Sequence, residues 1–179
     1  MDVYILRHGK AEEHEPGVAD EGRKLTKKGR REVAEVGGWI AAQGLTFDRI
    51  ATSPLARAHE TAKIVAGVLD IPDRMVTWDM LAPGGDPDTI CHELDGHADA
   101  GAVLLVGHEP LLSSLIGRII AGNESAGIIM TKGSLAKIRN FSFHAQPSGE
   151  LHWLITVKQM AGTGKNSTNA GPADHVFLR

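Results

Sequence analysis

Apolar residues form short continuous runs at several places along the chain. The first run opens the chain and reaches Leu6, and its β-branched and aromatic residues predict a short buried strand. Further runs at Phe47 to Thr52 and at Met75 to Trp78 predict two more strands. The run from Ala102 to Val106 is continuously apolar, which is typical of a central strand buried on both faces of a sheet.

Between these runs, apolar residues recur with the spacing of one buried helix face. The predicted helices run from Thr26 to Gly44, from Ser53 to Leu69, from Asp86 to Leu94 and from Leu112 to Gly122. Thr26 and Ser53 are expected to cap the first two helices, and Pro54 then takes the first helical position. Residues 11–25 are charged, contain Pro and Gly, and predict a loop.

The last section of the chain changes character. Leu135 to Phe143 and Leu151 to Val157 predict two strands, with a turn at residues 147–149 between them. The alternation of strands and helices predicts an α/β fold, a three-layer α/β/α sandwich whose mainly parallel sheet ends in a C-terminal antiparallel hairpin. We expect one domain over residues 1–160 and a flexible or loosely docked tail over residues 161–179, which are rich in Gly, Ser, Thr and Asn.

Composition restricts the partners that the chain is expected to have. Hydrophobic residues make up 42% of the 179 positions, and a net charge of −3 gives no case for nucleic-acid binding by bulk charge. No apolar run is long enough for a transmembrane helix, and the chain enters a strand at once, without the basic start of a signal peptide. The single cysteine, Cys91, favours a reducing compartment. We therefore expect a cytoplasmic protein with no nucleic-acid and no membrane partner.

The nine histidines are scattered rather than grouped as metal ligands. His92 and His97 lie five positions apart, off the spacing that places two ligands on one helix face. We expect no metal site, and nothing in the sequence implies a cofactor.

Histidine follows two of the predicted strands directly. His8 comes after Leu6-Arg7, and His108 comes after Val106-Gly107, while Arg57 stands near the start of the second predicted helix. If the strands are parallel neighbours, Arg7, His8, Arg57 and His108 converge at the carboxyl edge of the sheet, where ligands bind in α/β folds. Cationic donors around a histidine suit a dianionic phosphoryl group, and attack by that histidine would give a phosphohistidine intermediate.

Each of these residues also has a simpler interpretation when taken alone. Arg-His-Gly is a short motif, and His8 could be an ordinary loop histidine. Arg57 could be a surface residue paired with Glu60 or Glu21. The basic stretch of residues 27–31 indicates a solvated helix face rather than a binding patch.

Three stretches together resemble the signatures of the histidine phosphatase superfamily, which includes the cofactor-dependent phosphoglycerate mutases. They are residues 6–9, residues 53–58 with Thr61 and Ala62, and Gly107-His108, in the order of the family. The resemblance implies a phosphoglycerate mutase-like fold over residues 1–160 and a metal-independent hydrolase. It further implies His8 as the nucleophile, with Arg7, Gly9, Arg57 and His108 in contact with the phosphoryl group.

Within the superfamily the chain resembles the SixA-type phosphohistidine phosphatases, on residues 20–29 and 81–86. The long insertion that mutase-type members carry after the second signature has no counterpart here. A short lid means an open site, which suits phosphate presented on a protein surface. The resemblance thus implies a phosphohistidine-bearing phosphotransfer or signalling protein as the substrate. A small phosphomonoester as substrate and a non-catalytic phosphate-binding module remain the alternatives.

Glu109 directly follows His108 and allows two interpretations. Acid phosphatases and phytases of the superfamily have an aspartate at this place that protonates the leaving group, so the resemblance makes Glu109 a candidate general acid. Alternatively, Glu109 stabilises the start of the next helix through the helix dipole. The sequence leaves the roles of Lys10 and Arg23 open; mutases usually have a small polar residue where Lys10 stands.

Overall fold

The computed structural model describes residues 1–14 and 19–166, and within this part a six-stranded sheet forms the centre of the fold. The strands are β1 (Asp2–Arg7), β2 (Arg49–Thr52), β3 (Met75–Thr77), β4 (Ala102–Gly107), β5 (Leu135–Phe143) and β6 (Pro147–Ile155). They lie in the order β3-β2-β4-β1-β5-β6; the first four are parallel, and β5 and β6 add antiparallel pairs. The predicted α/β class with a mainly parallel sheet and a C-terminal hairpin is therefore confirmed.

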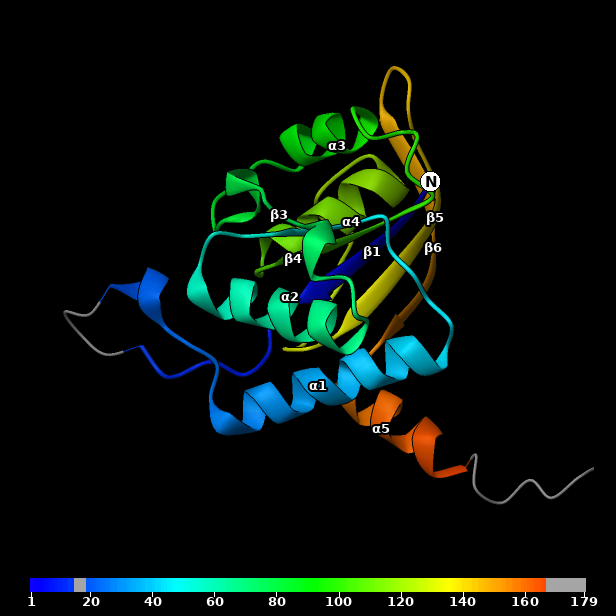
Figure 1. Ribbon diagram of the computed structural model, residues 1–179. Coiled ribbons are helices and arrows are strands. Elements are labelled where there is room, and N and C mark those ends of the chain that lie inside the picture. Colours follow the sequence, from blue (N-terminus) through cyan, green and yellow to red (C-terminus); the bar gives the residue numbers. More distant parts are fainter. Residues whose placement is uncertain (15–18, 167–179) are drawn as a thin grey trace, which may run out of the picture.

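Helices cover both faces of this sheet (Figure 1). They are α1 (Lys27–Ala42), α2 (Ala56–Val68), α3 (Pro87–Asp95), α4 (Leu111–Ala121) and α5 (Val157–Asn166), with short 3-10 turns η1 (Asp20–Gly22), η2 (Pro72–Arg74) and η3 (Asp79–Leu81). Residues of α1, α2 and α5 pack into one buried cluster, and residues of α3 and α4 pack into another on the opposite face. None of these helices is long and apolar enough to cross a membrane.

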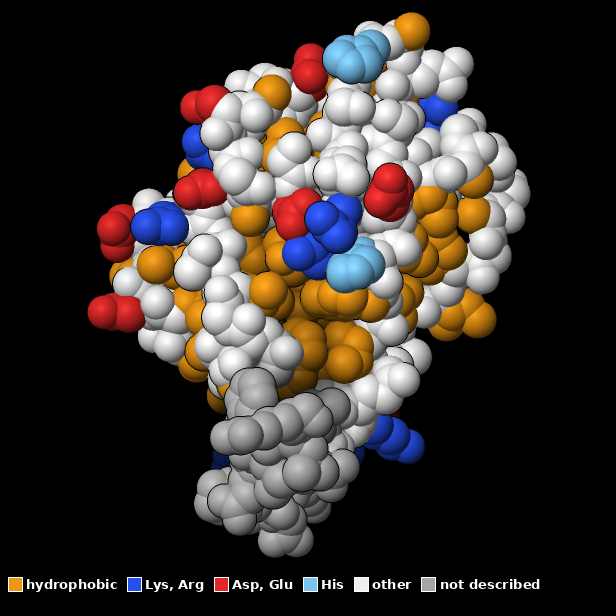
Figure 2. All heavy atoms as spheres, turned by 90° about the vertical axis from the view of Figure 1, so that its right-hand side faces the viewer, with side chains coloured by type: hydrophobic (Ala, Val, Ile, Leu, Met, Phe, Trp, Pro, Cys, Tyr) orange, Lys and Arg blue, Asp and Glu red, His pale blue; other side chains and the backbone are white. Residues whose placement is uncertain are grey.

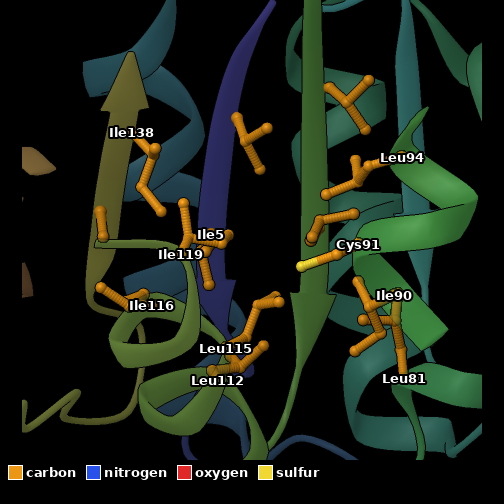
Figure 3. Packing of buried hydrophobic residues seen from close by; sticks show 14 of the residues in the cluster. Ile5, Leu81, Ile90, Cys91, Leu94, Leu112, Leu115, Ile116, Ile119 and Ile138 are labelled. Atoms are coloured by element: carbon orange, nitrogen blue, oxygen red, sulfur yellow. The ribbon is translucent and has the colours of Figure 1, made fainter. Parts of the chain in front are cut away.

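The core between the sheet and helices α3 and α4 consists of interlocking aliphatic side chains (Figure 3). Ile5 of β1 and Ile138 of β5 are fully buried, as are Leu112 and Leu115 of α4. Cys91 of α3 points into the same cluster, where burial raises its pKa to about 12. The cysteine is therefore a small apolar packing residue here and not a reactive thiol.

Polar side chains and glycines mark the predicted ends of several helices. Thr26 caps α1 by accepting a hydrogen bond from Gly29 N, and Asp86 caps α3 by accepting from Asp88 N and Thr89 N. Gly122 ends α4 with a φ of 69°, a left-handed conformation in which glycine carries no Cβ penalty. These boundaries agree with the sequence prediction because caps are local interactions.

Three predicted boundaries are wrong. Helix α2 begins at Ala56, after Leu55, so Ser53 does not cap it and Pro54 lies outside it. The hairpin turn falls on residues 144–146, whereas Pro147 to Gly149 belong to β6. Val157 is the first residue of α5 and not the last residue of a strand, and no helix was predicted there. At two of these boundaries a tertiary contact is present, because Ser53 binds His108 and Val157 packs against Gly133.

The predicted tail, residues 161–179, overlaps the end of α5, which reaches Asn166. The remainder of the tail lies outside the described residues, so the division at residue 160 stays a prediction. On the face shown in Figure 2, acidic and basic side chains are interspersed, and hydrophobic side chains gather below them.

Candidate active site

The two histidines that follow strands lie side by side at the carboxyl edge of the sheet. Strands β1 and β4 pair in parallel with Arg7 opposite Gly107, so His8 and His108 occupy matching positions one residue further on. The amide of His8 donates to the carbonyl of Gly107 at 3.1 Å, and the two ring centroids are 5.0 Å apart. The structure thus brings together the residues that the strand pattern predicted would converge.

The ring of His8 is oriented by its own backbone neighbour. Its Nδ1 lies 2.8 Å from the carbonyl oxygen of Gly9. A carbonyl oxygen only accepts, so Nδ1 carries the hydrogen and Nε2 keeps a free lone pair. Burial, and next the charges of Arg57, Arg7 and Lys132, lower the pKa of His8 to about 4, against the raising effect of the Gly9 hydrogen bond. Burial contributes more to this lowered pKa than the arginine charges do, and His8 is a neutral imidazole with an available electron pair at neutral pH.

His108 is held by Ser53, the residue that the sequence assigned to a helix cap. Ser53 Oγ lies 2.9 Å from His108 Nε2 and also accepts a hydrogen bond from Leu55 N at 3.3 Å. Burial, followed by the nearby His8 and Arg57, lowers the pKa of His108 to about 3, so the ring is neutral and carries a single hydrogen. If the Ser53 hydroxyl donates to Nε2, that hydrogen sits on Nδ1, which is buried without a partner.

Each of the two arginines is held by hydrogen bonds to another part of the chain. Arg7 Nη1 donates to the carbonyl of Met130 at 2.7 Å, and Arg57 Nη1 and Nη2 donate to Asp20, to its carbonyl at 2.9 Å and to its carboxylate at 2.8 Å. Arg57 is only 4% exposed. Glu60 instead binds Arg30, so pairing of Arg57 with Glu60 or Glu21 as a surface residue is wrong. Arg57 is a buried residue tied to the loop that follows β1.

Within the described part of the chain, the buried side-chain nitrogens and oxygens without a hydrogen-bond partner are Arg7 Nε, Arg57 Nε and His108 Nδ1. Each unpartnered buried donor destabilises the fold by roughly 1–3 kcal/mol, so such groups are rare without a function. All three belong to the residues that converge around His8. An oxyanion bound beside His8 would satisfy them and balance the two arginine charges.

Gly9 and Thr61 hold the backbone behind His8. The amide of Gly9 donates to Thr61 Oγ1 at 3.1 Å, and Thr61 in turn donates to the carbonyl of Arg57 at 2.7 Å. A Cβ at Gly9 would lie 2.5 Å from Val33 of α1, so only glycine allows this close approach. The amide of Gly9 binds Thr61 and its carbonyl binds the His8 ring. Gly9 therefore holds the ring of His8 in place from behind.

Glu109 lies at the start of α4, where its carboxylate binds Ser113. Oε1 accepts from Ser113 N at 3.2 Å, and Oε2 accepts from Ser113 Oγ at 2.5 Å. This geometry favours the helix-end interpretation of Glu109 over that of a general acid. Of the two residues left open by the sequence, Lys10 is exposed, and Arg23 binds the Asp20 carboxylate at 2.6 Å.

The sequence did not indicate the two residues that hold His108 and Arg57, which are Ser53 and Asp20. Ser53 was read as a cap because it precedes a proline and a helical pattern, and its contact with His108 spans 55 positions. Asp20 begins the stretch of residues 20–29 that carries the SixA resemblance, but the sequence assigned it no role; it binds Arg57 and Arg23. The described residues contain no group of three or more His, Cys, Asp or Glu side chains that could hold a metal ion.

Comparison with known proteins places this site in a family. Residues 3–82 match the family described as histidine phosphatase superfamily (branch 1). The chain is 30% identical over 158 residues to the phosphohistidine phosphatase SixA of Escherichia coli, covering 87% of this chain and 94% of that protein. The chain belongs to the histidine phosphatase superfamily, and it is a phosphatase.

Solved structures give the same result for the fold. A structure of the protein histidine phosphatase SixA complexed with tungstate matches with a TM-score of 0.78 and 25% identity, over 88% of this chain and 98% of that one. The α-ribazole phosphatase from Shigella flexneri matches with a TM-score of 0.71 and 16% identity, over 88% and 97% of the two chains. The latter likeness concerns the fold alone, and its name shows that the fold also carries phosphatases for small molecules.

Proposed function

We propose that the protein hydrolyses phosphohistidine on a phosphotransfer or signalling protein, with His8 as the nucleophile. The observation that carries the proposal is the neutral His8 ring with a free Nε2, beside three residues with an unpartnered buried nitrogen: Arg7, Arg57 and His108. The similarity to SixA over most of both chains supports phosphohistidine as the substrate group. Tungstate, which that relative's structure contains, is an oxyanion of the kind that these donors would bind.

The reaction proceeds in two transfers at phosphorus. His8 Nε2 attacks the phosphorus, a P–N bond to His8 forms, and the P–N bond to the substrate imidazole breaks while that imidazole takes up a proton from solvent water. Arg7 and Arg57 stabilise the charge on the equatorial oxygens, and His108 donates to one of them through Nδ1–H. Water then attacks the phosphorus of phospho-His8, a P–O bond forms and the P–N bond to His8 breaks. The electron pair returns to Nε2, the water protons leave with phosphate or pass to solvent, and neutral His8 results.

An imidazole is a better leaving group than an alkoxide, because after protonation it departs neutral. The site therefore does not need a strong general acid, which agrees with a Glu109 carboxylate bound to Ser113. A second candidate is a phosphatase for small phosphomonoesters, as the likeness of the fold to an α-ribazole phosphatase suggests.

The test compares kcat/KM on a histidine-phosphorylated phosphotransfer protein with kcat/KM on a panel of small phosphoesters. We expect the phosphoprotein to be preferred by at least about a hundredfold, and His8→Ala to lower turnover by several orders of magnitude at an unchanged melting temperature. Mass spectrometry of acid-labile phosphate on His8 after rapid quenching checks the intermediate. Preference for a small ester would establish the second candidate, and turnover by His8→Ala within tenfold of the parent would remove His8 as nucleophile.

A further inference from the structure

The segment between α4 and β5 is joined to the residues that hold the phosphoryl group. The carbonyl of Met130 accepts from Arg7 Nη1 at 2.7 Å, and Gly133 N donates to the carbonyls of Arg7 and His8 at 3.1 and 3.2 Å. Thr131 and Ser134 hydroxyls are 2.7 Å apart and close the turn between them. The segment is therefore fixed at the edge of the site by its backbone, and its side chains have defined positions relative to His8.

Ile129 projects from this fixed segment into solvent. Its exposed fraction is 79%, the largest of the exposed large hydrophobic residues in the described part of the chain. Its neighbours are held inward, since Ile128 packs against the core and Met130 is 1% exposed. A single exposed isoleucine is unremarkable elsewhere on a surface. Here it stands one residue from the carbonyl that orients a phosphate-binding arginine.

Two lysines line a hollow that includes Thr131 and Lys132 of this segment. Lys132 is near enough to His8 for its charge to act on the ring, and a hollow of about 350 Å³ is lined by Lys132 and Lys158 together with Thr131 and Thr156. The hollow also contains Glu32, whose carboxylate is paired with Lys28 at 3.5 Å. Neither Lys132 nor Lys158 forms a salt bridge with the described residues. The hollow therefore suits a carboxylate from outside.

We propose that Ile129, with the hollow formed by Lys132 and Lys158, is the docking surface for the phosphohistidine-bearing protein. The inference rests on the proposed function. A phosphohistidine on a protein brings the surrounding protein surface to the edge of the site, whereas a free phosphoester does not. The partner that fits has an apolar side chain beside its phosphohistidine, to cover Ile129, and an acidic side chain that enters the hollow.

The experiment measures kcat/KM of Ile129→Ser and Lys158→Gln on a histidine-phosphorylated phosphotransfer protein and on free phosphohistidine. Val68→Ser is the matched apolar control, because Val68 is 43% exposed and lies at the far end of α2 from the site. Arg139→Gln is the matched charge control, because it removes one exposed cation from the middle of β5, four residues beyond the strand's first residue, Leu135, which pairs with Leu6 near the site. Melting temperatures of all four variants show whether any of them perturbs the fold.

We expect Ile129→Ser and Lys158→Gln each to lower kcat/KM on the phosphoprotein by about tenfold, mainly through KM, and to leave free phosphohistidine within about twofold. The loss for Lys158→Gln should shrink at high salt. An equal loss on both substrates, or no loss on the phosphoprotein, would overturn the docking surface and leave the proposed function standing. Failure of the parent enzyme to hydrolyse any phosphohistidine protein would overturn both.

Discussion

At the scale of the residue, we expect the Ser53 hydroxyl to donate to His108 Nε2 and thereby to keep the ring hydrogen on Nδ1. We expect Ser53→Ala to weaken inhibition by tungstate or phosphate by about tenfold and to lower kcat, because His108 loses the partner that keeps the hydrogen on Nδ1. Ser53→Thr should restore much of the loss. Nitrogen chemical shifts of the His108 ring report its tautomer directly.

Thr52 provides the matched control for this prediction. It is a fully buried hydroxyl residue next to Ser53, but its Oγ1 donates to the Ser53 carbonyl and not to a histidine. Thr52→Val should therefore leave oxyanion inhibition near that of the parent. If both variants weakened inhibition equally, Ser53 would be only a packing residue.

For Glu109, the contacts with Ser113 predict a structural effect. Glu109→Gln should lower the free energy of unfolding by about 1 kcal/mol, because one accepting oxygen at the start of α4 is lost. The rates on an alkyl phosphate, on p-nitrophenyl phosphate and on phosphohistidine should change by the same factor. A selective loss on the alkyl phosphate would instead identify Glu109 as the general acid, since an alkoxide leaves poorly without a proton.

At the scale of the element, close packing of α1 against the loop after β1 depends on Gly29. A Cβ at this position would lie 2.0 Å from the carbonyl oxygen of Lys10, two residues beyond His8. Gly29→Ala should therefore destabilise the protein by about 2 kcal/mol or more and lower kcat as the loop shifts. Thermal unfolding and kinetics on the same preparation measure the two effects.

Gly38 of the same helix is the control, because a Cβ there would meet nothing within 4 Å. Gly38→Ala should stabilise the helix by about 0.5–1 kcal/mol and leave kcat unchanged. Loss of stability in both variants would mean that the approach at Gly29 is not the cause.

The elements also show what the sequence could and could not predict. Periodicity located each strand of the sheet and helices α1 to α4, since burial imposes its pattern locally. It missed α5, whose helical residues include two glycines, and it displaced the start of α2 and the hairpin turn. For the site, the sequence indicated which strand ends would converge. It could not indicate Ser53 and Asp20 as partners of His108 and Arg57, because those contacts join distant positions without a local signature.

At the scale of the whole molecule, the buried histidines couple folding to pH. Burial lowers the pKa of His8 to about 4 and that of His108 to about 3, whereas the usual value is 6.5. Below pH 6.5 the histidines bind protons in the unfolded chain but not in the folded chain. The free energy of unfolding therefore falls as the pH falls toward 4. We expect a loss of up to roughly 3 kcal/mol for each histidine, measured by urea unfolding across this range.

Substitution of one histidine at a time separates their contributions. His8→Asn should flatten the pH dependence of stability between pH 6.5 and 4, because the proton-binding difference at this position disappears. His152→Gln, which changes an exposed histidine of β6, should leave the slope as it is. An unchanged slope in His8→Asn would show that His8 does not titrate with folding.

The charge of the whole site leads to a prediction about metals. Arg7 and Arg57 already supply the positive charge that magnesium provides in many phosphoryl-transfer enzymes. Activity should therefore persist after dialysis against a chelator, and added divalent ions should not raise kcat. Dependence on an added ion would contradict a site built from arginines and histidines alone.

The pairing of β1 with β4 has a consequence for how such enzymes diversify. The positions of the two histidines are set by a backbone ladder in which Arg7 lies opposite Gly107 and His8 N binds the carbonyl of Gly107. The chain between His8 and His108 leaves the sheet after β1 and returns to it in β4. The length of that intervening chain therefore does not alter the distance between the two histidines. Segments can be inserted or deleted between β2 and β4 during evolution, and new substrates acquired, while the reacting groups keep their geometry. The sheet thus fixes the distance between the two histidines, and the segments between its strands can change to bind a different substrate.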